Sequence, residues 1–76
     1  MSASEEAFNY ERYADAVEEA LNRVAAKNGT VRIRQIQLET SVPKDLILEV
    51  LNKKIVEFPD RVDKIVDSEG GKSWKK

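Results

Sequence analysis

The sequence predicts a small α+β domain spanning residues 1–76, with the element order helix, strand, helix, helix, strand, strand. Three observations lead to this prediction. Apolar residues recur at helical spacing over 5–28, two shorter helical patterns meet at a tight turn within 34–54, and two β-compatible runs within 61–76 flank a pair of glycines. We therefore expect three helices followed by a small C-terminal β-hairpin.

The first helix is predicted over residues 5–28. A serine of the frayed segment 1–4 can cap its start, and Asn28-Gly29 should end it, because both residues tolerate the left-handed conformation that closes a helix. Its buried face consists of residues at helical spacing, namely Tyr10, Tyr13, Val17, Ala20, Leu21 and Val24.

Residues 30–34, TVRIR, alternate between apolar and basic side chains. Val31 and Ile33 fall on one side, and Arg32 and Arg34 fall on the other. The run is short, so it is either a strand or an extended lead into the second helix.

Residues 34–54 predict two helices joined by a turn at 40–42. Pro43 fixes φ at the first position of the later helix, and Ser41 can accept a hydrogen bond from its first turn. Apolar stripes run along both helices, with Ile33 and Ile36 in the earlier one and Leu46, Ile47, Val50 and Leu51 in the later one.

Residues 61–76 predict a β-hairpin whose loop, 68–71, contains both glycines. Four apolar side chains of its arms are expected to reach the core: Val62, Ile65, Val66 and Trp74.

The pair of helices within 34–54 resembles a helix-turn-helix, and with the flanking strand and hairpin the chain resembles a winged-helix domain. Val42 stands where that family places the apolar residue that closes the turn. Gln37, Thr40 and Ser41 depart from the family pattern, in which alanine, leucine and glycine are common. The resemblance implies a protein that binds double-stranded DNA, as a regulator of transcription or as a factor associated with chromosomes or replication.

Composition narrows the class of protein. With no cysteine and no histidine, the chain can form no disulfide and lacks the usual zinc ligands. The net charge of −1 conceals an asymmetry: residues 1–26 carry two basic and six acidic groups, whereas residues 27–76 carry eleven basic and eight acidic groups. A nucleic-acid surface should therefore lie in the second half. The acidic N-terminus and the short apolar runs predict a cytoplasmic protein without a membrane segment.

No motif points to catalysis. The Gly-Lys-Ser tripeptide at 71–73 lacks the upstream glycine of a phosphate-binding loop, because Val66 occupies that position. Ser41 and Lys44 form a Ser-x-x-Lys pattern without the second motif that such enzymes require. So short a chain can hardly enclose a substrate pocket, and we expect neither an enzyme nor a cofactor or metal site.

The outward face of the helix after Pro43 is the first candidate for DNA contact. Lys44 could bind phosphate or guanine, Asn52 an adenine edge and Leu48 a thymine methyl group. Asp45 and Glu49 on the same face oppose a polyanion. These polar residues are alternatively no more than a solvated helix surface.

The hairpin and the first strand supply the remaining candidates, which are basic side chains able to bind the DNA backbone. The complete set of candidate nucleic-acid-binding residues is Arg32, Arg34, Lys44, Leu48, Asn52, Lys53, Arg61, Lys64, Lys72, Lys75 and Lys76.

A second hypothesis treats the domain as a protein-interaction module, a small accessory subunit of a nucleic-acid-processing complex. Phe8, which lies off the main stripe of the first helix, and Leu48 would then dock a protein partner. A homodimer through the first helix would be a natural supplement to so small a core.

Overall fold

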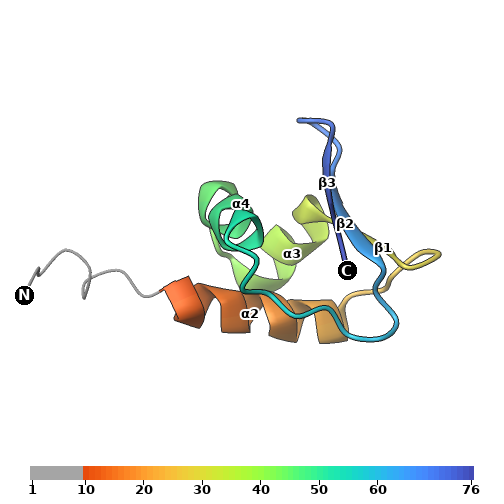
Figure 1. Cartoon of the computed structure of the whole chain (residues 1–76), viewed down its shortest axis with the longest axis horizontal. Helices are drawn as coiled ribbons and strands as arrows, with labels where there is room; N and C mark the ends of the chain where they lie inside the picture. Colours follow the sequence, from red (N-terminus) through yellow and green to blue (C-terminus); the bar gives the residue numbers. More distant parts are fainter. Residues whose placement is uncertain (1–9) are drawn as a thin grey trace, which may run out of the picture.

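The computed structural model describes residues 10–76, and its elements follow the predicted order (Figure 1). This part of the chain contains α2 (Tyr10–Arg23), β1 (Thr30–Arg32), α3 (Ile33–Thr40), α4 (Lys44–Asn52), β2 (Lys64–Asp67) and β3 (Lys72–Lys75). The α+β class is confirmed. The predicted frayed segment, the helix start at residue 5 and its serine cap lie outside the described residues.

The first helix ends at Arg23, so the predicted end at residue 28 was wrong. Asn28 and Gly29 do have positive φ angles, 55° and 78°, but they form a two-residue turn. On either side of it, Lys27 and Thr30 exchange two backbone hydrogen bonds of 3.0 Å. Two successive left-handed residues suit a tight reverse turn as well as a helix end, and here they lead the chain into β1.

The three strands form one sheet in the order β1-β2-β3. The hairpin of β2 and β3 is antiparallel, whereas β1 pairs with β2 in parallel. Both interpretations of residues 30–34 are partly right, because β1 ends at Arg32 and Ile33 opens α3. The Gln35 side chain accepts a 2.9 Å hydrogen bond from the Arg32 amide, which stabilises the immediate change from strand to helix.

Ser41 ends α3 rather than capping α4, which corrects the predicted role. Its φ of 62° is left-handed, and its amide donates to the Gln37 carbonyl at 2.8 Å. The hydroxyl of Thr40 donates to the Ile36 carbonyl at 2.7 Å and accepts from the Val42 amide at 3.0 Å, so it closes the turn. Pro43 is the N-cap residue of α4 and not its first helical residue.

The core lies where α2 packs against both α3 and α4, with the sheet closing one end (Figure 1). Two expected core residues, Leu46 and Val66, are only half-buried and lie outside it. Strand alternation turns Val66 outward, because its neighbours Ile65 and Asp67 face inward. The buried apolar residues are Ala14, Val17, Ala20, Leu21, Val31, Ile33, Ile36, Ile47, Val50, Leu51, Val62 and Ile65.

The left-handed geometry of Ser41 yields a stability prediction. Ser41→Gly should stabilise the domain by up to about 1 kcal/mol, because glycine adopts positive φ without a steric penalty. Ser41→Ala should change the free energy of unfolding by less than about 0.5 kcal/mol, because the hydroxyl caps nothing. Urea unfolding of the three proteins measures both effects. A loss near 1 kcal/mol in Ser41→Ala would instead indicate a cap on α4.

Candidate nucleic-acid interface

Lys44, the first residue of α4, is engaged within the molecule. Its ammonium group lies 3.1 Å from Asp67 Oδ1 and 2.8 Å from Glu69 Oε1, so it joins the start of α4 to the end of β2 and the hairpin loop. Hydrogen bonds to Glu69 and then Asp67 raise the pKa of Lys44 above its ordinary value. These contacts occupy the ammonium group of Lys44 and make it a weaker candidate for binding phosphate or guanine than the sequence suggested.

Asp67 is the buried partner in this cluster, with an exposed fraction of only 6%. Burial raises the pKa of its carboxyl group, but hydrogen bonds from Lys44 and the Gly70 amide outweigh burial and bring the pKa below its ordinary value. The Glu69 amide also donates to Asp67 Oδ1, at 3.2 Å. The carboxylate therefore shapes the hairpin loop as well as holding the loop to α4.

The other two candidates on α4 also serve the fold. Asn52 Oδ1 accepts a 2.9 Å hydrogen bond from Trp74 Nε1, which fastens β3 to the end of the helix. Leu48 is half-buried and packs against the core, so it does not point outward as predicted. Asp45 and Glu49 remain exposed, and the outward face of α4 is therefore acidic.

Three further basic candidates have intramolecular partners. Arg61 Nη2 donates to the carbonyls of Leu21 and Val24, each at 2.7 Å, and so satisfies the end of α2. The Lys53 ammonium lies 4.5 Å from the centroid of the Tyr10 ring. These contacts give Arg61 a structural role. The ammonium group of Lys53 lies against Tyr10, the first residue of α2.

Lys76 completes this group. Its ammonium donates to the Asp60 carbonyl at 3.2 Å and lies 3.9 Å from the Asp60 carboxylate. It is therefore a weaker candidate for phosphate than the sequence suggested.

The outer face of the sheet gathers three of the remaining cations. The strand register places Lys64 beside Lys75, and Arg32 beside Val66. Because side chains alternate along a strand, Arg32, Lys64 and Lys75 all point away from the buried face that holds Val31 and Ile65. All three cations are exposed, and the ion pairs found within residues 10–76 include none of them.

The Lys64–Lys75 pair is electrostatically unfavourable. Lys76 N donates to Asp63 O, and pairs alternate along an antiparallel ladder, so Lys64 and Lys75 form the close, non-hydrogen-bonded type of pair. Like charges directly opposite each other destabilise a sheet. An anion bound on this face would relieve the repulsion.

One further cation flanks the face. Arg34, in the first turn of α3, lines a surface depression with Arg32 and Leu38. Lys72, at the hairpin end of β3, is exposed, but the register places it opposite Asp67, so it belongs to the other face of the sheet. We define the basic sheet face as Arg32, Arg34, Lys64 and Lys75.

Leu38 is not among the residues predicted from the sequence to bind a ligand, yet its side chain is 75% exposed. Its spacing could have indicated this, since it is two residues beyond Ile36 and therefore off the buried stripe of α3. It adds an apolar contact beside Arg32 and Arg34.

No protein-family model, curated protein or solved structure matches this chain. Among residues 10–76, no helix is long and apolar enough to cross a membrane. The same residues contain no cluster of three or more side chains suited to hold a metal ion.

The Lys44–Asp67 contact predicts a pH dependence of stability. A carboxyl group whose pKa is lowered by folding stabilises the fold at pH values above its pKa in the unfolded chain, and this stabilisation is lost as the pH falls through its pKa in the folded protein. An ammonium group whose pKa is raised by folding stabilises the fold at pH values below its pKa in the unfolded chain, and this stabilisation is lost as the pH rises through its pKa in the folded protein. Wild type should therefore exceed Asp67→Asn in stability by a constant margin at neutral pH, narrowing below roughly pH 4 and above roughly pH 10.5.

Urea midpoints measured across this range test the prediction. Asp45→Asn is the matched control, because Asp45 is an exposed carboxylate next to Lys44 in α4 and takes part in none of the ion pairs of residues 10–76. A margin between wild type and Asp67→Asn that stayed unchanged from acid to neutral pH would contradict the assigned role.

Proposed function

We propose that this protein is a winged-helix protein that binds double-stranded DNA through the basic sheet face, with the β2–β3 hairpin as its wing. In cellular terms it would regulate transcription or act with chromosomes or the replication apparatus. The observation that carries the proposal is that Arg32, Lys64 and Lys75 share one face of the sheet and take part in none of the ion pairs of residues 10–76.

The element order supports the winged-helix part of the proposal. A first strand lies beside the hairpin, and two short helices joined by a three-residue turn pack on a longer one. In this arrangement α4 would be the recognition helix. Its exposed Asp45 and Glu49 would repel phosphates, and Lys44 is neutralised by Asp67 and Glu69. The charges therefore favour binding by the wing and sheet over insertion of α4 into the major groove.

The number of available cations sets the expected mode of binding. Three or four phosphate contacts correspond to a slope of log K against log salt of about −2.7 to −3.6. Backbone contacts carry no base sequence information of their own, so preference for a site would come from DNA shape or from Leu38 and Arg34 at the edge of the face. We infer a dissociation constant in the micromolar range at low salt.

The hypothesis that Phe8 and Leu48 dock a protein partner has less support than the DNA proposal. Leu48 is half-buried against the core, and Phe8 lies outside the described residues. The homodimer through the first helix also gains no support, because the face of α2 opposite the core exposes charged side chains such as Glu11, Asp15 and Glu19.

Fluorescence anisotropy with a short labelled duplex tests the DNA proposal. The double variant Lys64→Gln/Lys75→Gln should weaken binding about tenfold at low salt and reduce the salt slope by about 2, one unit for each phosphate that is no longer neutralised. Both side chains are exposed and face each other, so the fold should be kept or slightly stabilised.

The matched control is Lys53→Gln/Lys54→Gln, which removes the same charge at the end of α4. It should leave DNA affinity within about twofold of wild type, and this small loss would reflect only the lower net charge of the protein. An equal loss in both double variants would refute the assigned face. No anisotropy change at micromolar protein in low salt would refute DNA binding altogether.

A further inference from the structure

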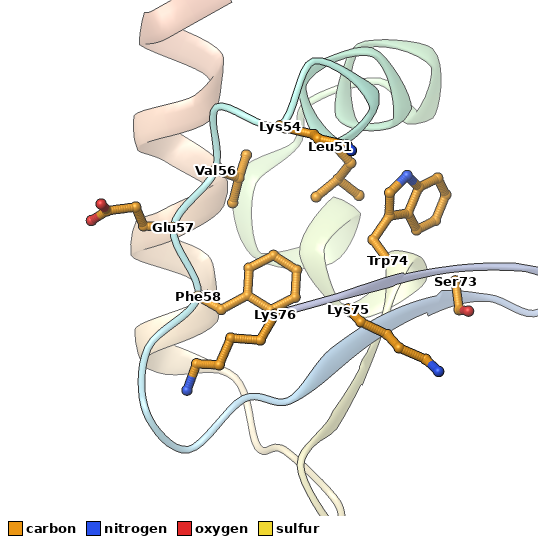
Figure 2. Close-up of a pocket in the computed structure, with 9 residues that line it drawn as sticks. All are labelled: Leu51, Lys54, Val56, Glu57, Phe58, Ser73, Trp74, Lys75 and Lys76. Atoms are coloured by element: carbon orange, nitrogen blue, oxygen red, sulfur yellow. The ribbon is translucent and has the colours of Figure 1, made fainter.

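A groove lies between β3 and the segment that connects α4 to β2, and it is separate from the outer face of the sheet (Figure 2). Its volume is about 860 Å³. The floor is apolar, built from Leu51, Val56, Phe58 and Trp74. Of these only Leu51 is fully buried, so the other three offer contact area to a ligand.

The rim of the groove is basic. Lys54, Lys75 and Lys76 line it, and Lys76 is held at one end by Asp60. Glu57 is the one carboxylate among the lining residues, and Figure 2 shows its side chain pointing away from the groove. Lys54 and Lys75 take part in none of the ion pairs of residues 10–76, so the rim suits an acidic occupant.

The edge of β3 faces this region with unpaired backbone groups. In the order β1-β2-β3 the last strand has a neighbour on one side only. Ser73 and Lys75 belong to the non-hydrogen-bonded pairs with β2, because the Lys76 amide bonds to Asp63 and pairing alternates. Their amide and carbonyl groups therefore point to the free edge, where an added strand could bind them.

A second copy of the chain is a poor occupant of this edge. Lys72 and Lys75 place one positive charge on each face of β3, and lysines on an edge strand oppose the pairing of two copies. A strand with carboxylates on the face of Lys75 would meet that lysine with opposite charge.

We propose that the β3 edge and its groove form a binding site for an extended acidic peptide of a partner protein, which adds a strand beside β3. Apolar side chains on one face of the peptide would contact Trp74 and Phe58, carboxylates on its other face would lie beside Lys75, and the charge of Lys54 at the rim would add to the attraction. This site is independent of the proposed DNA contact.

The test uses the whole chain and blocked synthetic peptides, one alternating valine with glutamate and one alternating valine with lysine. Trp74 is the sole tryptophan and lines the groove, so its fluorescence reports occupancy directly. Saturation with the acidic peptide should shift this fluorescence and slow amide hydrogen exchange of Ser73 and Lys75 at least about tenfold. The basic peptide should do neither.

Two substitutions separate strand addition from simple charge attraction. Ser73→Pro removes an edge amide without removing a β2–β3 hydrogen bond and should abolish peptide binding, whereas Ser73→Ala should keep it. Lys54→Glu lies outside the strand and should weaken binding of the acidic peptide at least about tenfold. Lys64→Gln should leave peptide binding unchanged even where it weakens DNA binding, so that the two proposals fail separately.

Other occupants would overturn the proposal. Equal binding of both peptides, or no response to the acidic one at millimolar concentration, excludes an acidic strand. Fluorescence quenching by oligothymidylate alone would identify the groove as a single-stranded nucleic-acid site. Protection of Lys75 that rises with protein concentration in the absence of peptide would identify a second copy as the occupant.

Discussion

The contact between Lys44 and Asp67 is the constraint on which the arrangement of the hairpin depends. A carboxylate with 6% exposure needs a partner, because an unpaired buried charge is costly, and α4 supplies that partner with its first residue. At the other end of the same helix Asn52 holds Trp74. Two contacts at opposite ends of one short helix fix both strands of the hairpin relative to α4. Neither contact would survive a large change in the angle between α4 and the hairpin.

These contacts also decide which surface is left for a ligand. Lys44 and Asn52 are the residues that a recognition helix would offer to DNA bases, and here both are used to hold the hairpin. What remains exposed on α4 includes Asp45 and Glu49. Lys44 and Asn52 thus cannot hold the hairpin and contact DNA bases at the same time. The cations that escape this competition lie on the sheet, because Lys64 has another lysine opposite it rather than a carboxylate.

The sequence predicted features that depend on neighbouring residues better than contacts between residues far apart in the chain. Helical and strand periodicity are local, and they predicted the order of the elements and most of the core. The contacts that the sequence did not indicate join residues distant in the chain: Lys44 with Asp67, Asn52 with Trp74, and Arg61 with the carbonyls that end α2. Nothing in the residues around Lys44 indicates that a carboxylate 23 positions later will bind it. The excess of basic groups in residues 27–76 can be counted in the sequence, but only the structure divides these cations into paired and unpaired ones.

The two proposed surfaces meet at Lys75, and strand geometry decides whether they exclude each other. The side chain of a strand residue is perpendicular to the sheet, whereas its amide and carbonyl lie in the plane of the sheet. Strand addition would engage the backbone of Lys75 at the free edge and leave its ammonium group near the outer face beside Lys64. A peptide carboxylate could draw that ammonium toward the groove and reduce its availability to phosphate. The expected relation between the two ligands is therefore weak competition through a single charge and not mutual exclusion, since Arg32 and Lys64 lie outside the groove.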